Sequence, residues 1–326
     1  MAEVSKYIKK IHIEGLLGSK TFDWSLKEDV NILGGENGSG KSTVIKACYQ
    51  LLRQGKLTDE VLLNTISKME ITLSNGCKIS LTLEPIYLVF DDDSPILLGD
   101  GTALLAEDSP KQTLKVTDKS GKPKDFQSVA KELDVDMVST FEQKITDAIR
   151  MSQISSENKN GSIFLDWLIE QELNKRNKAF AGTFGRMVDV STGRVATSAE
   201  YSSEIKQFMA LYDHLKLFFE DYDVNVTNSL DFSKNGTSIR YQDLSMGEKE
   251  LLYILLKVSN KKGKPCIVFM DEPDLGMHVS WKKVFVKVLH DMNPKMQLIL
   301  TTHAPSMING WFDNVKEVGE LTKEEK

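Results

Sequence analysis

The chain has 326 residues, of which 40% are hydrophobic and 27% charged, and its formal net charge is −6. This length allows one large core or two subdomains, and the negative charge excludes a general attraction to nucleic acid or anionic membranes. No apolar run has the length of a transmembrane helix and the N-terminus lacks the pattern of a secretory signal, so we expect a cytoplasmic protein without membrane insertion. Three widely spaced cysteines among apolar residues predict reduced thiols.

The first third of the chain predicts an antiparallel β layer. Alternating residues from Tyr7 to Val30 indicate two strands of a hairpin, and the buried strand Val30 to Leu33 runs directly into glycine. A second hairpin follows, with Asn75 and Gly76 as a two-residue turn in which both residues need positive φ. From Asp91 to Pro123 the polar, Pro- and Gly-containing sequence is typical of loops and edge strands.

The rest of the chain predicts helices and then an alternating α/β unit. Ser162 to Tyr222 has apolar residues at helical spacing, which indicates a helical subdomain with an internal loop. Cys266 to Met270 and Met296 to His303 are apolar strands that flank a helix over Val279 to Met292. This βαβ order predicts parallel strands, whose carboxyl ends are where such sheets bind ligands.

The sequence GENGSGKS, Gly35 to Ser42, has the G-x-x-x-x-G-K-[ST] pattern between a predicted strand and a predicted helix. Its glycines let backbone N–H groups surround a phosphate chain. Lys41 can reach the β and γ phosphates, and Ser42 can hold Mg²⁺. A phosphate-binding loop is therefore predicted here.

Polar residues follow the two apolar strands of the last third. Asp271 and Glu272 end the first strand, where one carboxylate can bind Mg²⁺ through water and its neighbour can activate the attacking water. His303 ends the second strand and can donate to a γ phosphate, although a structural hydrogen bond is the alternative. Gln143 can sense Mg²⁺ and the γ phosphate from a strand-to-helix junction, or it is polar surface.

The sequence LSMGEKELL predicts a helix start. Ser245 and Glu248 have the spacing of a capping box, and the apolar stripe of an amphipathic helix follows at Leu251, Ile254, Leu255 and Val258. Gly247, beside the cap, leaves room for a second interpretation in which the helix N-terminus receives a phosphate.

Four motifs, GENGSGKST, LSMGE, FMDEP and TTH, occur in the order of the Walker A, signature, Walker B and switch-histidine motifs, and they resemble those of ABC-type ATPases. DEPDLGMH and YIKKIHIEGLLG are similar to the RecF-like and OLD-like ATP-binding proteins. The resemblance implies an α/β fold: an ABC-type P-loop ATPase head with a mixed sheet, an antiparallel β layer and an inserted helical subdomain. It divides the chain into an N-terminal lobe (1–150), the helical subdomain (151–230) and a C-terminal lobe (231–326).

The resemblance also implies ATP, Mg²⁺ and a homodimer that encloses two nucleotides. Glu272 would be the general base, His303 and Gln143 would sense the γ phosphate, and Ser42, Asp271 and Gln143 would hold Mg²⁺. Ser245 and Gly247 of one subunit would close on the γ phosphate bound by the other. The triphosphate-binding residues would be Gly35, Glu36, Asn37, Gly38, Ser39, Gly40, Lys41, Ser42 and Thr43.

His278 departs from the pattern of ABC transporters, which usually have an aspartate there; it either contributes to communication between sites or only starts a helix. The function expected is ATP hydrolysis, even if slow, that gates a separate effector, such as a nuclease or toxin in anti-phage defence, or DNA. The alternatives are the nucleotide-binding subunit of a membrane transporter and an ATP-clamped DNA-repair protein. For the latter, Lys175, Arg176, Lys178, Arg186 and Arg194 offer a basic patch.

Overall fold

The computed structural model describes residues 7–84, 110–139, 161–189, 194–195, 210–226 and 230–324. Its contacts form two compact units. The first unit comprises residues 1–28, 33–135 and 316–326, and the second comprises 29–32 and 136–315. The second unit thus holds both the helical middle and the last third of the chain, and the division into three domains stays a prediction.

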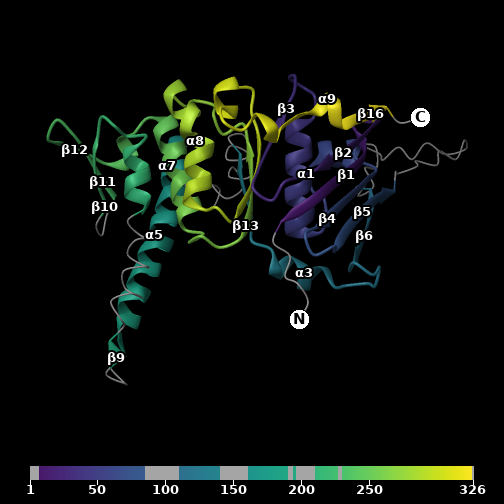
Figure 1. The fold of residues 1–326 in the computed structure, drawn as a ribbon, viewed down its shortest axis with the longest axis horizontal. Coiled ribbons are helices and arrows are strands. Elements are labelled where there is room, and N and C mark those ends of the chain that lie inside the picture. The colour runs from purple at the N-terminus through teal and green to yellow at the C-terminus, as the bar shows by residue number, and fades with distance from the viewer. Residues whose placement is uncertain are drawn as a thin grey trace, which may run out of the picture. The chain divides into compact units, whose positions relative to one another are not determined.

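The first unit contains the predicted antiparallel layer (Figure 1). Its six strands pair in the order β16-β2-β1-β4-β5-β6, each antiparallel to its neighbours. The strands are β1 (Ile8–Leu16), β2 (Lys20–Ser25), β4 (Lys68–Leu73), β5 (Lys78–Glu84), β6 (Lys111–Thr117) and β16 (Thr322–Glu324). The helices are α1 (Lys41–Gln54), α2 (Glu60–Thr65), α3 (Phe126–Glu132) and α9 (Val318–Leu321).

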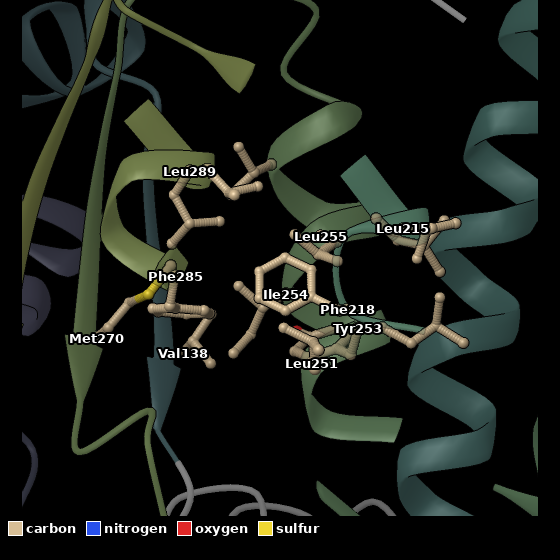
Figure 2. Close-up of a cluster of buried hydrophobic side chains, with 14 of the residues drawn as sticks. Val138, Leu215, Phe218, Leu251, Tyr253, Ile254, Leu255, Met270, Phe285 and Leu289 are labelled. Atoms are coloured by element: carbon tan, nitrogen blue, oxygen red, sulfur yellow. The ribbon is translucent and has the colours of Figure 1, made fainter. Parts of the chain in front are cut away.

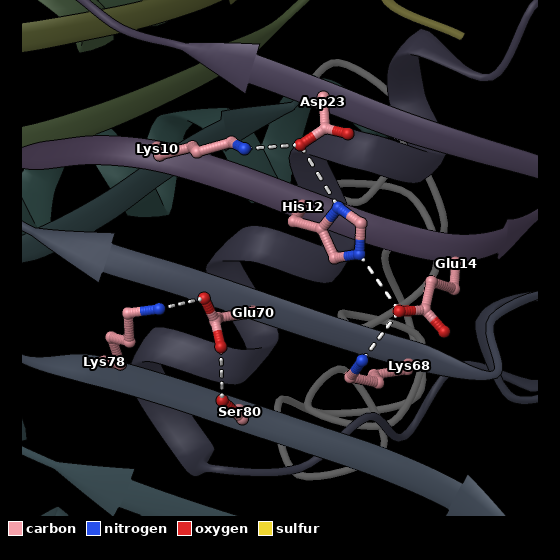
Figure 3. A network of polar contacts seen from close by, with 8 residues as sticks. All are labelled: Lys10, His12, Glu14, Asp23, Lys68, Glu70, Lys78 and Ser80. Carbon is pink, nitrogen blue, oxygen red and sulfur yellow. Dashed lines mark hydrogen bonds and ion pairs between the residues drawn. The ribbon is translucent and has the colours of Figure 1, made fainter. Parts of the chain in front are cut away.

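The alternation along these strands separates a buried face from a polar one. Ile11, Trp24 and Ile71 are buried on one face, whereas Figure 3 shows charged residues of β1, β2, β4 and β5 paired on the other. There the His12 ring nitrogens lie 3.2 Å from Asp23 Oδ1 and 3.0 Å from Glu14 Oε1. Exposed ion pairs of this kind contribute little to stability. The apolar side chains of the buried face therefore supply most of the free energy that stabilises this sheet.

The hairpin predicted around Asn75 and Gly76 is present, but its turn is not the predicted one. Gly76 has φ of +80°, whereas Asn75 is absent from the residues with positive φ. The Gly76 N–H donates to Leu73 O at 2.9 Å, and Asn75 Oδ1 accepts from the Cys77 N–H at 2.9 Å. The loop is therefore one residue longer than a two-residue turn, and a single glycine in the left-handed region closes it.

The second unit is built on a five-stranded sheet with the order β15-β3-β14-β13-β7. Its strands are β3 (Val30–Gly34), β7 (Val135–Ser139), β13 (Cys266–Asp271), β14 (Met296–Thr301) and β15 (Val315–Glu317). Of these, β3, β7 and β15 each have residues in both units. β13 and β14 are parallel and are joined by α8 (Val279–Met292), so the predicted βαβ unit is confirmed.

Helices cover this sheet, and Figure 1 shows α5 (Gly161–Met187) running along α7 (Met246–Ser259) and continuing past it. Residues 210–216 are also helical. No helix in the described part of the chain combines the length and the apolar sequence that crossing a bilayer requires. The remaining elements are β8 (Val188–Asp189), β9 (Arg194–Val195), β10 (Asp223–Val226), β11 (Leu230–Lys234), β12 (Thr237–Ile239) and the 3-10 helices η1 (Tyr241–Asp243), η2 (Pro305–Ile308) and η3 (Phe312–Asn314).

The core of the second unit explains why α7 is apolar on several sides. Leu251 to Leu256 are all buried, because α7 packs among α5, α8 and the sheet (Figure 2). Phe285 and Leu289 of α8 contribute to the same core. Each fully buried side chain of this size stabilises the fold by about 1.5–3 kcal/mol.

Candidate functional site

The predicted phosphate-binding loop connects the end of β3 to α1 in the first unit. Gly38 and Gly40 have φ of +76° and +99°, a region that disfavours other residues. Gly40 is also the N-cap of α1, and no side chain caps the helix. No N-cap side chain therefore accepts from the N–H groups of the first turn, which contains Ser42 and Thr43. These N–H groups form a site for an anion.

Two side chains of this loop support the same assignment. Lys41 is only 4% exposed, and its Nζ donates to Gly35 O at 2.9 Å and Glu36 O at 2.8 Å. Ser39 Oγ is buried without a hydrogen-bond partner. A buried hydroxyl and a buried ammonium beside an uncapped helix N-terminus fit a triphosphate, which would accept from both.

Sequence reasoning missed one residue near the loop. Glu317 of β15 lies so close to Gly34 that a Cβ on that glycine would be 2.5 Å from Glu317 Oε1. Gly34 must therefore lack a side chain for this carboxylate to pack there. No motif marks the contact, because the two residues are far apart in the sequence.

Asp271, Glu272 and His303, predicted from the ends of two strands, come together in the second unit. Asp271 is 1% exposed, and its Oδ1 accepts from Thr301 Oγ1 at 2.7 Å. Glu272 Oε1 lies 3.4 Å from His303 Nε2. The parallel register, in which Asp271 is paired with Thr301, places these residues at the same sheet edge.

The backbone of Glu272 is in an uncommon conformation, with φ of +48°. Such a conformation costs about 1–3 kcal/mol for a residue other than glycine and is often retained at functional sites. The Glu272 N–H donates to Thr301 Oγ1 at 3.0 Å, so one threonine hydroxyl contacts both acidic residues. Thr301 is a residue that sequence reasoning missed, although its position directly before Thr302 and His303 is a signal for it.

A second threonine makes a similar link. Asp274 is 5% exposed, and its carboxylate accepts from Thr302 Oγ1 at 2.9 Å and from Lys282 Nζ at 3.1 Å. Thr301, the last residue of β14, and Thr302, directly after it, thereby hold Glu272 and Asp274 in the segment that follows β13. This arrangement fixes the loop that carries Glu272.

The signature segment begins α7 with the predicted capping box. The Glu248 N–H donates to Ser245 Oγ at 3.4 Å, and the Ser245 N–H donates to Glu248 Oε2 at 2.7 Å. Tyr222 Oη donates to Glu248 Oε1 at 2.9 Å. Burial, with the hydrogen bond to this carboxylate, raises the pKa of Tyr222 to about 12. The interpretation of LSMGE as a helix cap is therefore confirmed.

Gly247 also has an intramolecular reason to be glycine. A Cβ there would lie 2.3 Å from Gly276 O, in the loop after β13. The start of α7 is consequently packed directly on the segment that connects Glu272 to α8.

His278 is the N-cap of α8. Its Nδ1 accepts from the Ser280 N–H at 3.4 Å and lies 2.7 Å from Ser280 Oγ. Of the two roles considered for this residue, helix start is the one for which the structure gives contacts.

Two predictions concern the middle of the chain. Gln143 lies outside the described residues, so its role stays a prediction. Arg176 does not belong to an exposed basic patch, because it is 6% exposed and donates to Ser259 Oγ at 3.2 Å. Lys175 and Lys178 are exposed, and Lys175 pairs with Glu172 at 2.6 Å. The side chains of Arg186 and Arg194 also lie outside the described part.

The comparisons with known proteins agree with this fold. The retron Vc95 probable ATPase of Vibrio cholerae serotype O1 biovar El Tor is 24% identical, over 91% of this chain and 70% of that protein. The Septu protein PtuA of Bacillus thuringiensis is 23% identical, over 92% and 72%. An SMC head bound to the C-winged helix domain of ScpA has a TM-score of 0.54 at 13% identity, over 95% of this chain and 93% of that one.

The family comparison covers nearly the whole chain. The model of the RecF/RecN/SMC N-terminal domain matches residues 7–325. That span includes the phosphate-binding loop, the signature segment and the Asp271–His303 cluster. The protein therefore belongs to the RecF/RecN/SMC N-terminal domain family and has the ATPase head fold of SMC and RecF proteins.

Proposed function

We propose that this protein hydrolyses ATP, with Glu272 as the general base. The observation that carries the proposal is the geometry at Glu272, whose left-handed backbone is held by Thr301 and whose carboxylate lies 3.4 Å from His303. This backbone conformation costs free energy, and it holds the Glu272 carboxylate beside a histidine. Both features fit a general base that must orient and deprotonate a water molecule. The relative named a probable ATPase supports the same activity.

The substrate would bind through the loop from Gly35 to Thr43. Its backbone N–H groups, Lys41 and Ser39 Oγ are the donors for the phosphates. Mg²⁺ would neutralise the charge that develops on the phosphates, with Ser42 and Asp271 as its protein ligands. The described residues include no cluster of three or more His, Cys, Asp or Glu suited to a metal, so phosphate oxygens and water would complete the coordination, as is usual for Mg²⁺.

The protein would act as an ATP-dependent homodimer in which Ser245 and Gly247 of one subunit close on the nucleotide of the other. Three exposed apolar residues support this part of the proposal. Met246, Leu275 and Val279 are 46%, 41% and 57% exposed, and they belong to the segments that the contact between Gly247 and Gly276 joins. Exposed apolar side chains gathered near a functional motif favour an interface.

Dimerisation would transmit the nucleotide state to a separate effector protein. The solved SMC head bound to a domain of ScpA supports a partner for a head of this fold. A role in anti-phage defence and a cytoplasmic location remain part of the proposal, as does an effect on DNA.

The test compares Glu272→Gln, Lys41→Ala and the wild type in ATP binding and turnover. Glu272→Gln removes the base but no phosphate donor, so it is expected to bind ATP, to accumulate as a dimer and to lose roughly 10²- to 10⁴-fold in turnover. Lys41→Ala is expected to lose nucleotide affinity. Glu320→Gln, the same change at an exposed residue of α9, is the control and should leave both unchanged. Wild-type turnover in Glu272→Gln would disprove the assignment of the base.

A further inference from the structure

A cavity of ≈660 Å³ lies in the second unit beside the signature segment. It is bounded by residues 218–222, by Lys234, by Ser245 and Glu248 at the start of α7, and by residues 276–278 with Ser280 and Trp281. Its volume is in the range of about 300–1,000 Å³ that ligand sites occupy. The phosphate-binding loop and the Asp271–His303 cluster contribute nothing to its lining, and Ser245 is the one lining residue that the proposed function also uses.

One wall of the cavity is aromatic and rigid. The ring of Trp281 lies 6.3 Å from that of Phe218 and 5.9 Å from that of Phe219, centroid to centroid. Both phenylalanines are buried, whereas Tyr222 and Trp281 are partly exposed. The wall therefore contains two aromatic rings, Tyr222 and Trp281, that pack against buried rings of the core.

The other lining groups make the cavity acidic. Glu220, Asp221 and Glu248 contribute three carboxylates against the single ammonium of Lys234, which gives a formal charge of −3 + 1 = −2 with His278 neutral. A ligand that carries phosphates is disfavoured by this charge, whereas a cation is attracted. The ring faces add to that preference, because a cation is attracted to an aromatic face.

Lys234 already makes both kinds of contact at the rim. Its Nζ lies 5.2 Å from the centroid of the Tyr222 ring and 3.4 Å from Asp221 Oδ2. This side chain is 44% exposed, so it can be displaced. The chain's own cation thus shows that a positive charge fits between this carboxylate and this ring.

We propose that the cavity binds an arginine side chain of a partner polypeptide. A guanidinium is planar and can stack on Trp281 while it donates two parallel hydrogen bonds to a carboxylate, which an ammonium cannot do. The cavity is larger than one side chain, and its carboxylates are spread over the 218–222 segment and α7, which favours a short peptide segment over a free small cation.

A ligand bound in the cavity would affect the signature segment through Glu248. Its two carboxylate oxygens accept from the Ser245 N–H and from Tyr222 Oη. A guanidinium that pairs with Glu248 would compete with both donors and so change the cap of α7. This step rests on the proposed function, because it links the partner to the residues that would close on the nucleotide.

The test uses the full chain without nucleotide and the probe peptide acetyl-Gly-Arg-Gly-Arg-Gly-amide. Binding is followed by calorimetry at low salt, with the same peptide carrying citrulline, a neutral analogue of arginine, as the matched control. The arginine peptide is expected to bind at least about tenfold more tightly than the citrulline peptide, which corresponds to about 1.4 kcal/mol. Equal affinities, or no binding of the arginine peptide, would overturn the proposal.

Variants test whether the arginine peptide binds in the cavity or elsewhere on the surface. Asp221→Asn and Trp281→Phe should weaken binding several-fold, whereas Lys234→Ala should strengthen it, since the competing cation is gone. A misfolded variant cannot bind more tightly, so Lys234→Ala also controls for folding. Asp313→Asn, at an exposed acid outside the cavity, should have no effect. Unchanged affinity in all three cavity variants would overturn the site.

ATP turnover, measured with and without the arginine peptide, distinguishes the two proposals. A change in turnover supports the coupling through Glu248, and binding without any change overturns the coupling alone. A chain that binds the arginine peptide but never hydrolyses ATP would overturn the proposed function and leave the cavity assignment intact.

Discussion

At Gly247 the first turn of α7 comes so close to the loop after β13 that a Cβ would lie 2.3 Å from Gly276 O. Backbone cannot yield as the end of a flexible side chain can, so Gly247→Ala should displace the helix start. We expect a decrease of about 1–3 kcal/mol in the free energy of unfolding, in the absence of ATP. Chemical denaturation measures it.

Gly319→Ala is the matched control, because nothing lies within 4 Å of a Cβ at that position and its φ is not in the left-handed region. That variant should be as stable as the wild type. Equal stability of Gly247→Ala would show that the close approach to Gly276 O is not what requires a glycine here.

Single residues also mark the limit of what the sequence predicts. The identities of Lys41, Asp271 and Glu272 follow from local motifs, because the chemistry of phosphates and Mg²⁺ restricts which residues can serve. The left-handed backbone of Glu272 and its hydrogen bond to Thr301 depend on how β13 and β14 pair. No pattern within either strand contains that information.

At the scale of elements, periodicity predicted the hairpins of the first unit and the βαβ unit of the second. These elements follow from local alternation and from short connections, which a single sequence records. The turn at Asn75 was wrong because one hydrogen bond, from the Gly76 N–H to Leu73 O, selects a longer loop. Arg176 was placed on the surface because its partner, Ser259, is 83 residues away.

An ionic cluster joins β7 to the end of α7. Asp136 pairs with Lys257 at 3.3 Å and also with Lys261. Burial by itself would raise the pKa of Asp136, but the charges of the two lysines outweigh it and hold the pKa below its usual value of 3.8. A carboxyl with a lowered pKa stabilises the fold above the pKa of the unfolded chain, and this contribution is lost as the pH falls through the folded value.

Asp136→Asn should therefore lower the free energy of unfolding at pH 7, where the ionised carboxylate and both lysines are charged. The difference from the wild type should shrink as the pH falls below 3.8, because protonation removes the charge that the variant lacks. Urea denaturation at pH 7 and at pH 3 measures both differences. A difference that is the same at the two pH values would show that the charge of Asp136 is not what stabilises the junction.

At the scale of the whole molecule, the second unit carries exposed apolar residues that the proposed dimer would cover. Val279 is 57% exposed at the start of α8, where a helix N-terminus favours negative charge. A glutamate at this position therefore tests the interface without disturbing the fold. Val279→Glu, introduced together with Glu272→Gln, should bind ATP normally but sediment as a monomer, because dimerisation would bury the new carboxylate among apolar side chains. Val61→Glu, at a valine of α2 that is 62% exposed, is the control and should still dimerise. If Val279→Glu still forms an ATP-dependent dimer, the dimer interface does not include this surface. The signature segment would then act within one subunit only.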